Sequence, residues 1–553
     1  MRVLSENPLN AWRSHFFVDA RRARLSAVSD LERAEPLDDG LPARRPFLGP
    51  GDRRWLWGVA LLALIFRLLL LPIGHPWDVT TAYNMFIDLA TNHSPYDTLN
   101  YLNHVALSAQ WGSMYEYYAY PPAPLYLYFP LAKLFAALHP GATYFFPAEA
   151  QTAIPSLPWD FYLWYKLPMW IADFLIAVLL ARMTGSVRSA RDYVLNPYVL
   201  LVSGAWTFDS VMALGLLAGV YWVQQGKMTR AGLALAFGTM MKFFPALVVP
   251  TCALYLIKKK RPLRELLTFL GVYGLGCLVL LGPFWQGMLS ALSFHSARVG
   301  GGMTWEIIWQ YQQIWPKSWH MPAMMAQAAA AFGTPTLAIV LLLAYRYVFL
   351  KEMSLNRMVI ITLLAFFIGS KLVNEQYVLM LLPFVLIEVY RVGGAWRWLY
   401  RLFWIIPLAF ATMRVPLDHF LWLFYGTVFG SRAANVIAIT HQTGFESPLT
   451  PWDMPRFVVA SLVLLGLSFF GLCVVAIFWP VPPVIRPAVR PENKLVKAGL
   501  HAAETEGDVP LVRKHEADHG AAVDTREEKS GDMLPGVNAG ASQFIAGTTV
   551  PAP

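Results

Sequence analysis

The sequence predicts an all-α polytopic membrane protein, from its composition, its aromatic content and the spacing of its apolar runs. Of its 553 residues, 56% are hydrophobic and only 14% are charged, and the chain holds 21 Trp, 24 Tyr and 34 Phe. So many aromatic side chains exceed the need of a soluble core and suit the aromatic belts at the two surfaces of a bilayer. Apolar runs punctuated by basic clusters predict a bundle of about twelve transmembrane helices, each span taking about 20 residues.

The two ends of the chain differ from this apolar middle. Residues 1–54 are polar and arginine-rich and contain no apolar stretch that resembles a signal peptide, so we expect a cytoplasmic N-terminal segment. Residues 486–553 are rich in Pro, Glu, Lys and Ala and poor in aromatics, which predicts a disordered cytoplasmic tail. The membrane domain is therefore expected over 55–485. The net charge of +9 is explained by positive cytoplasmic loops, and no basic stripe suggests a nucleic-acid partner.

The three cysteines offer neither a disulfide framework nor a metal-binding pair. Cys252, Cys277 and Cys473 all lie in apolar runs, far apart in the sequence. We expect each to act as a small buried hydrophobe.

Basic clusters set the expected topology. Arg53 and Arg54 place the start of the first span, Trp55 to Ile73, in the cytoplasm, because cytoplasmic loops carry the excess of Lys and Arg. The next basic cluster begins at Arg182, so residues 74–158 are expected to form a long first extracytoplasmic loop. The apolar stretch Tyr120 to Leu138 would then be a re-entrant or interfacial helix, packed on protein. If it crossed the membrane, the Arg182 cluster would face outward instead.

Asp78 is the leading candidate for chemistry. It stands in Gly74-His75-Pro76-Trp77-Asp78, where the chain leaves the first span, and a carboxylate there is costly and hard to explain as packing. With the predicted topology, further polar groups fall at the same outer level. They are Asp209, Lys242, Lys371, Asn374, Glu375 and Gln376. An outer loop over 286–322 adds Glu306 and several Trp and Tyr side chains, which suit stacking against sugar rings or anchoring at the interface.

Each of these residues also has an ordinary structural explanation. A lone Asp at the end of a span is commonly a helix cap, and a lone Lys commonly extends its ammonium toward the interface. Asp173, in mid-span seven residues after Lys166, is expected to be a structural polar partner, and Arg67 either extends outward or reaches the site. The coincidence of two lysines with carboxylates on one side favours a phosphate-bearing ligand and a base that takes a hydroxyl proton.

An ordered set of motifs carries a family resemblance. After the aspartate come Ser94-Pro95-Tyr96, Tyr120-Pro121-Pro122, Leu195-Asn196-Pro197, Met241-Lys242-Phe243-Phe244-Pro245 and Lys371 to Tyr377. Over residues 55–390 this order resembles the GT-C class of integral-membrane glycosyltransferases. It is especially similar to mannosyltransferases that use polyprenyl- or dolichyl-phosphate-mannose.

The resemblance implies inverting transfer of a sugar, by preference mannose, from a polyprenyl-phosphate-linked donor to a lipid or glycan acceptor. The site would face outward from the plasma membrane, in a bacterial cell. Asp78 matches the family's catalytic aspartate and would be the general base. Lys242, Lys371 and Gln376 would bind the phosphate or orient the sugar, with Glu375 beside them, and Asp209 would hold sugar hydroxyls or a lysine.

The residues around Asp78 depart from the family pattern in one respect. Some relatives carry an Asp-x-Asp pair, but here the chain reads Pro76-Trp77-Asp78-Val79-Thr80, and Asp88 is too distant to replace the second aspartate. A divalent metal needs several oxygen ligands, so we expect chemistry without a metal or cofactor. Two alternatives remain: a lipid or sugar transporter or flippase, and a non-catalytic assembly subunit.

Overall fold

The fold is taken from a computed structural model, which describes residues 50–96, 118, 120–143, 157–206, 208–297, 301–310, 321–414 and 456–479. All of them lie within one compact unit, Met1–Val481. The predicted tail 486–553 and the N-terminal segment up to residue 49 lie outside the described residues. Within those residues the protein is helical apart from one parallel pair of two-residue strands, so the all-α prediction is confirmed.

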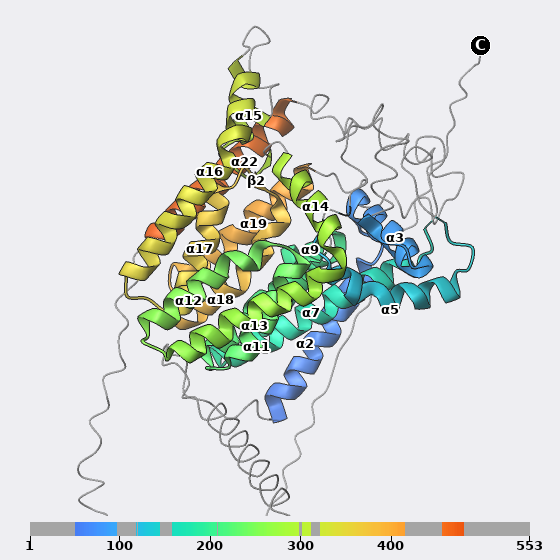
Figure 1. Ribbon diagram of the computed structural model, residues 1–553, viewed down its shortest axis with the longest axis horizontal. Helices are drawn as coiled ribbons and strands as arrows, with labels where there is room; N and C mark the ends of the chain where they lie inside the picture. Colours follow the sequence, from blue (N-terminus) through green and yellow to red (C-terminus); the bar gives the residue numbers. More distant parts are fainter. Residues whose placement is uncertain are drawn as a thin grey trace, which may run out of the picture. The chain divides into compact units, whose positions relative to one another are not determined.

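The helices and strands follow one another along the chain as Figure 1 labels them. They are α2 (Pro50–Leu69), α3 (Pro76–Thr91), α5 (Ala123–Leu138), α7 (Phe161–Thr184), α8 (Val187–Val194), α9 (Pro197–Ala205), α10 (Asp209–Gln224), α11 (Met228–Met241), η1 (Phe244–Leu247), α12 (Val248–Lys258), α13 (Leu263–Leu281), η2 (Gly282–Phe284), α14 (Trp285–Ala297), β1 (Gly301–Gly302), α15 (Ile307–Gln310), α16 (Met321–Leu350), α17 (Leu355–Gly369), β2 (Leu372–Val373), η4 (Glu375–Met380), α18 (Leu382–Arg391), α19 (Trp396–Arg414) and α22 (Arg456–Phe478).

Four described helical segments are long and apolar enough to cross a membrane. They are Phe161–Thr184, Leu263–Leu289, Ala331–Leu350 and Phe457–Phe478, and the pair α9 and α10, bent by 118°, makes a fifth if it is one span. This is a multi-pass architecture with fewer full-length spans, among the described residues, than the roughly twelve expected from apolar runs. Several predicted passes are short helices: α11 has 14 residues and α12 has 11, about 21 and 17 Å at 1.5 Å per residue.

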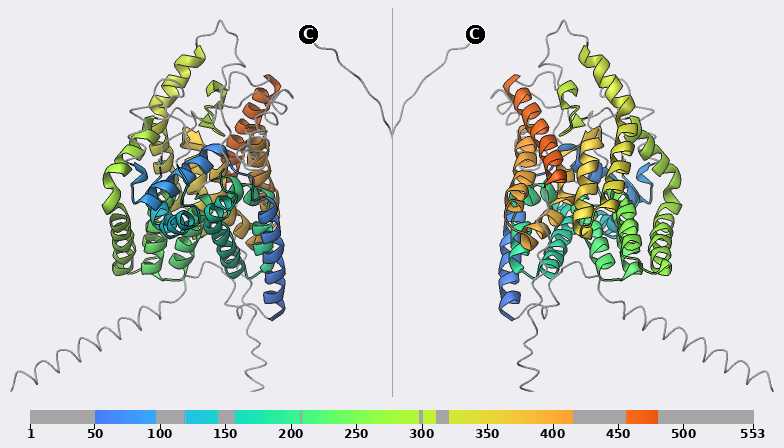
Figure 2. Two further views of the ribbon diagram at one scale, coloured as in Figure 1. Left: turned by 90° about the vertical axis from the view of Figure 1, so that its right-hand side faces the viewer. Right: turned by 90° about the vertical axis from the view of Figure 1, so that its left-hand side faces the viewer.

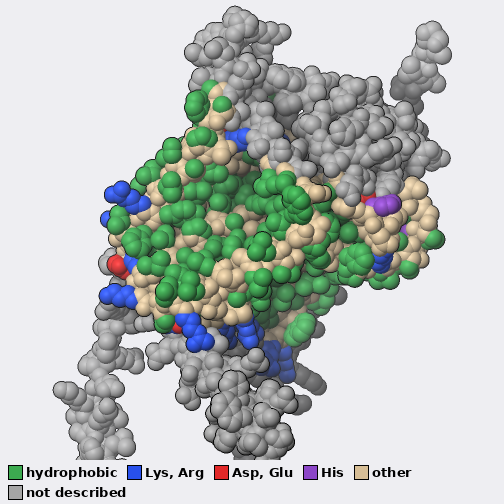
Figure 3. All heavy atoms as spheres, in the orientation of Figure 1, with side chains coloured by type: hydrophobic (Ala, Val, Ile, Leu, Met, Phe, Trp, Pro, Cys, Tyr) green, Lys and Arg blue, Asp and Glu red, His purple; other side chains and the backbone are tan. Residues whose placement is uncertain are grey.

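Two of the membrane-crossing candidates, the helices α13 and α16, expose a broad apolar surface. On α13 the side chains of Leu267 and Leu278 are 60% and 66% exposed, and on α16 those of Leu342 and Leu343 are 67% and 61% exposed. Figure 3 shows hydrophobic side chains covering this side of the molecule, with Lys and Arg gathered at its margins. An apolar surface of this kind needs hydrocarbon rather than water around it, which agrees with the membrane prediction.

The basic clusters between helices meet at one end of the helical bundle, which we call the basic end. The ammonium of Lys258, the last residue of α12, donates to the carbonyl of Lys351 after α16. Tyr390 of α18 donates to Asp192 of α8 at 2.7 Å, and Arg391 lies in the last turn of α18. The positive-inside rule makes this the expected cytoplasmic end.

Polar side chains inside the bundle bind one another or backbone groups. Arg67 of α2 forms a buried ion pair with Asp173 of α7 at 2.7 Å and donates to the carbonyl of Val194 at 3.1 Å. Lys166 donates instead to carbonyls in the turn just after α2, including those of Leu71 and Ile73 at 2.5 Å each, where a cation suits the dipole of the preceding helix. Asp173 is therefore a structural polar partner, as expected, and the residue with which it pairs is Arg67.

The segment expected to be an outer loop contains two packed helices. α3 and α5 lie side by side in Figures 1 and 2, and Lys133 of α5 donates to the carbonyl of Ala90 and to Asn92 Oδ1 at the end of α3, both at 2.7 Å. α5 has 16 residues, about 24 Å, too short to cross a hydrocarbon core of about 30 Å. The length of α5 suits the interfacial or re-entrant helix expected over Tyr120 to Leu138. The helix α3 itself was not foreseen.

Candidate active site at the start of helix α3

Asp78 lies in the first turn of α3 rather than in an irregular loop. Pro76 begins the helix and His75 is the N-cap residue, with no side-chain cap hydrogen bond. A carboxylate in a first turn interacts favourably with the positive end of the helix dipole. The Asp78 side chain is 11% exposed, so it is held by protein and still accessible.

Both carboxylate oxygens of Asp78 are oriented by neighbours. Oδ2 lies 2.9 Å from Nδ1 of His75, and Oδ1 accepts a hydrogen bond from the Tyr120 hydroxyl at 3.0 Å. His75 is fixed in turn, because its backbone N–H donates to the Ala205 carbonyl at 2.8 Å and its ring stacks on Trp206 at 5.8 Å. Groups from three separate segments therefore set the position of one carboxylate.

The Asp209–Lys242 ion pair lies next to this carboxylate. Lys242 Nζ is 2.7 Å from Asp209 Oδ2, and the two side chains are 7% and 1% exposed. Asp209 begins α10 and Lys242 follows the end of the antiparallel α11. These helices can approach closely because Gly215 and Gly238 have no side chains where they meet. A Cβ added to Gly215 would lie only 2.8 Å from Gly238 Cα. The charge of Asp78 also acts on Asp209.

Tyr120 joins the two groups. Its hydroxyl donates to Asp78, and its ring lies 5.4 Å from the Lys242 ammonium. The same ammonium also lies 5.8 Å from the Tyr377 ring. Such cation–π contacts stabilise a lysine charge away from water. We call this assembly the Tyr120 cluster; its members are His75, Asp78, Tyr120, Asp209, Lys242 and Tyr377.

Backbone strain occurs beside the Tyr120 cluster. Phe208, immediately before Asp209, has φ 64° and ψ −6°, the left-handed conformation that costs a non-glycine residue about 1–2 kcal/mol. Its buried ring packs edge-on against Tyr120, with centroids 5.0 Å apart, and against Tyr128 at 5.6 Å. Strain of this kind concentrates at functional sites, where packing maintains it.

A further hydroxyl lies near both carboxylates. Tyr165 of α7 is fully buried and interacts electrostatically with Asp78 and Asp209. Among the described residues no hydrogen-bond partner is found for its hydroxyl or for Asp209 Oδ1. Both groups therefore retain hydrogen-bonding capacity inside the protein.

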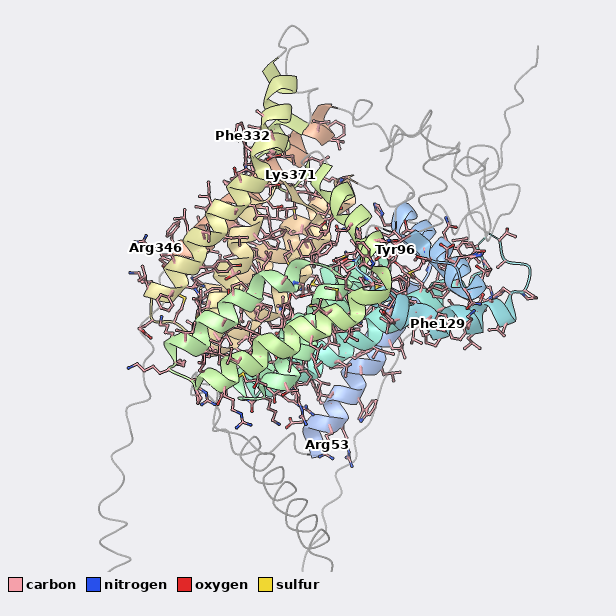
Figure 4. The ribbon with its side chains drawn as sticks, viewed as in Figure 1. Arg53, Tyr96, Phe129, Phe332, Arg346 and Lys371 are labelled. Carbon is pink, nitrogen blue, oxygen red and sulfur yellow. The ribbon has the colours of Figure 1, made fainter. Side chains whose placement is uncertain are left out.

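The other predicted residues lie beside the Tyr120 cluster or apart from it. Glu375 begins η4 and pairs with Arg414 at 3.0 Å. Gln376 is buried next to Tyr377, so η4 reaches the cluster through that tyrosine. Lys371 follows α17 and packs on Gly333 of α16, and its charge acts on Glu306. Figure 4 shows Lys371 near Phe332, away from Arg53 and Arg346.

Three members of the Tyr120 cluster had no predicted role. His75 and Tyr120 stood within quoted motifs, and Tyr377 ended the last motif, but none carried a charge that marked it as costly. The contributions of Tyr120 and Tyr377 depend on contacts with groups far away in the chain, as Tyr120 reaches Asp78, 42 residues before it. Spacing in the sequence does not contain that information, whereas His75 lies only three residues before Asp78.

Within the described ranges, no group of three or more His, Cys, Asp or Glu side chains has an arrangement that would hold a metal ion. The Tyr120 cluster instead combines a histidine-bound carboxylate, a buried ion pair and tyrosine hydroxyls. That combination suits a ligand with hydroxyl and anionic groups, and a proton transfer at Asp78.

The fold and site define a multi-pass helical membrane protein with a polar site at the start of α10, whereas the basic residue Lys227 follows the other end of that helix. A family model described as PIG-U, GPI transamidase subunit PIG-U, matches residues 61–310. This range includes Asp78, Tyr120, Asp209 and Lys242 and ends before Lys371. Comparison with curated proteins finds no match.

Two solved structures with similar coverage are of ArnT from Cupriavidus metallidurans. The apo structure aligns at 13% identity and a TM-score of 0.38, over 77% of this chain and 77% of ArnT. The structure bound to undecaprenyl phosphate aligns at 13% identity and a TM-score of 0.36, over 76% of this chain and 77% of ArnT. At these values the similarity extends to neither activity nor ligand.

Proposed function

We propose that this protein is a membrane glycosyltransferase that moves a sugar from a lipid-phosphate-linked donor to a hydroxyl acceptor, with Asp78 as general base. The observation that carries the proposal is the Tyr120 cluster, in which one tyrosine connects a partly exposed carboxylate with a buried lysine. The order of motifs along the sequence favours the same activity and favours mannose as the sugar. The site would face the extracytoplasmic side, opposite the basic end.

The reaction balances with the groups at hand. The acceptor oxygen forms a bond to the anomeric carbon as the bond from that carbon to the phosphate oxygen breaks. Asp78 takes the acceptor hydroxyl proton, and the lipid phosphate leaves with the electron pair of the broken bond. Attack from the face opposite the phosphate inverts the anomeric centre. General bases of this type contribute about 10²- to 10⁴-fold to the rate.

The partners of Asp78 fix the orientation of its carboxylate. Tyr120 and His75 each occupy one carboxylate oxygen, and a carboxylate has about four lone-pair positions, so an acceptor hydroxyl can still donate to it. Lys242 balances the charge of Asp209. Because Tyr120 contacts both Lys242 and Asp78, the ammonium lies on the same side as the base and would attract the donor phosphate there.

The test is sugar transfer by purified full-length protein in nanodiscs, with polyprenyl-phosphate-mannose as donor and a panel of glycolipid acceptors. We expect transfer by the wild type and a loss of about a thousandfold in Asp78→Asn. Asp160→Asn is the matched control, because Asp160 also pairs with a histidine, His139, at 2.8 Å but lies outside the Tyr120 cluster. Full activity in Asp78→Asn would reject the assignment of the base.

A second candidate is a non-catalytic subunit that holds a glycolipid for a partner enzyme. The specific observation in its favour is the family match over residues 61–310, whose description is that of a transamidase subunit. It predicts no transfer with any lipid-linked donor, together with retention of a glycolipid on purification. An Asp78→Asn variant would then lose the bound glycolipid without any change in a transfer rate.

A transporter or flippase is a weaker alternative. It requires polar groups near the middle of the bilayer, and the mid-span candidate Asp173 is paired with Arg67 at 2.7 Å. Scrambling of lipid-linked sugar in liposomes, without transfer, would favour it.

A further inference from the structure

A second polar region surrounds the contact between β1 and β2. The strands pair in parallel, with Gly301 opposite Leu372 and Gly302 opposite Val373, and the Met303 N–H donates to the Val373 carbonyl at 2.8 Å. Gly302 has φ +80°, and a Cβ there would collide with the Val373 carbonyl oxygen. Only glycine allows this approach, so the pairing brings residues 301–303 against residues 372–374, and the Lys371 charge reaches Glu306. We call this region the β1–β2 junction.

Several polar atoms at the junction are buried without a partner. The side chains concerned are Thr304, Glu306 and Gln376, which are 0%, 4% and 7% exposed. Among the described residues nothing donates to or accepts from Thr304 Oγ1, Glu306 Oε1 or Gln376 Oε1, and Asn374 Oδ1 is likewise unpartnered. Buried polar atoms are nearly always hydrogen-bonded in folded proteins. Four such atoms around one strand contact therefore indicate a missing set of donors.

The chemistry of the junction restricts what would supply those donors. The unpartnered atoms are acceptors, apart from the threonine hydroxyl, which acts either way. The positive charge of Lys371 lies close enough to act on Glu306, and it disfavours a cationic ligand. Burial raises the pKa of Glu306 to about 7, although the Lys371 charge lowers it. The raised pKa reduces the negative charge of Glu306 near neutral pH. A neutral ligand with several hydroxyls meets these conditions. Trp305, half-buried between Thr304 and Glu306, adds an aromatic surface of the kind that lines such sites.

We propose that the β1–β2 junction is a carbohydrate-binding site, separate from the Tyr120 cluster, that takes neutral sugar hydroxyls. Thr304, Glu306, Asn374 and Gln376 accept hydrogen bonds from the sugar, Lys371 donates to it, and the Trp305 ring packs against its apolar face. The site does not depend on Asp78 acting as a base. Binding at the junction is expected whether the protein transfers sugar or only holds a glycolipid.

The test is saturation-transfer NMR with full-length protein in nanodiscs of phosphatidylglycerol, which carry no sugar detergent. Because the chain holds 21 Trp, intrinsic fluorescence would not isolate Trp305. The probes are methyl α-mannoside, choline chloride and inorganic phosphate. We expect saturable binding of the mannoside only, weakened about tenfold in both Thr304→Val and Gln376→Met. Thr251→Val is the matched control, since Thr251 is equally buried but bonded to Thr362 at 2.7 Å.

Each result decides the proposal. Without ligand, Thr304→Val and Gln376→Met should be at least as heat-stable as the wild type, because they remove buried atoms that lack partners; a purely structural role would lower stability instead. No saturable mannoside binding, unchanged affinity in both variants, or binding of choline or phosphate in its place would overturn the inference. Asp78→Asn should still bind the mannoside, so failure of the proposed transferase and failure of this site are distinguishable.

Discussion

Two buried ion pairs of this protein, with the same 2.7 Å separation, are surrounded very differently. Arg67–Asp173 lies within the bundle, and its arginine also donates to the carbonyls of Ala63 and Val194. Asp209–Lys242 lies at the start and end of neighbouring helices, with two tyrosine rings around the ammonium and Asp209 Oδ1 without a described partner. Arg67 Nε likewise has no described partner, so an unpartnered atom does not distinguish the two pairs; they differ in the backbone carbonyls around the first cation and the tyrosine rings around the second. A buried ion pair is therefore a stronger candidate for function when aromatic side chains and a second carboxylate surround it than when backbone carbonyls hold its cation.

The largest effect should come from breaking the structural pair. Arg67→Leu leaves Asp173 buried without its cation, and the expected cost is about 3–5 kcal/mol of unfolding free energy. The double variant Arg67→Leu/Asp173→Leu should recover most of that stability and keep the wild-type transfer rate per folded molecule. Thermal unfolding of the purified proteins measures the change in stability, and the transfer assay measures the rate per folded molecule. A double variant that folds but transfers no sugar would place Asp173 in the reaction.

The corresponding double variant at the site should behave in the opposite way. Lys242→Met/Asp209→Leu removes both charges together, so stability should be near that of the wild type, while transfer should fall about a hundredfold, since the charges that position substrate are gone. The same two measurements apply. Equal transfer rates in the two double variants would erase the distinction between the pairs.

Removing the Tyr120 hydroxyl should have a smaller effect. Tyr120→Phe keeps the ring beside Lys242 and Phe208 but loses the hydrogen bond to Asp78, which at a charged acceptor corresponds to about 1.5–3 kcal/mol. We expect kcat to fall roughly tenfold or more with little change in stability. Tyr120→Leu, which also loses the ring, should be worse in both respects. If the two variants behave alike, the hydroxyl has no role of its own.

The smallest expected effect is a pH dependence of stability from Glu306. Burial raises its pKa from 4.5 to about 7, so folding favours the protonated form. That contribution is fully present below pH 4.5 and is lost as the pH rises through about 7. The melting temperature of the wild type should therefore decline over this interval relative to Glu306→Gln, which does not titrate. Parallel pH profiles for the two proteins would show that the carboxyl titrates normally.

Much of the architecture was predictable because apolar runs and basic clusters are strong local signals. Asp209 and Lys242 were expected near Asp78 from the alternation of passes alone, and the structure brings these residues together. The number of full-length spans was not predictable, because runs such as 231–241 form helices too short to cross and the chain bends between α9 and α10. Composition records how apolar a segment is, but not where the chain turns.

The details of the site were less predictable, for a physical reason. Lys371 resembles Lys242 in the sequence, yet α16 and the β1–β2 contact hold it near Glu306 instead. Tyr120 is an ordinary polar aromatic until packing places it on Asp78, whereas the contact of His75 with Asp78 is local. The roles of Lys371 and Tyr120 depend on tertiary contacts, which single-residue patterns do not encode.

The central claim is that Asp78 performs proton transfer rather than binding or support. The most direct measurement is the separate determination of kcat and of donor Kd for Asp78→Asn and Asp160→Asn, with melting temperatures as the control for folding. We predict that Asp78→Asn keeps its donor affinity and melting temperature but loses about a thousandfold in kcat, while Asp160→Asn keeps both kinetic values. Loss of donor binding with kcat preserved, or equal behaviour of the two variants, would contradict it.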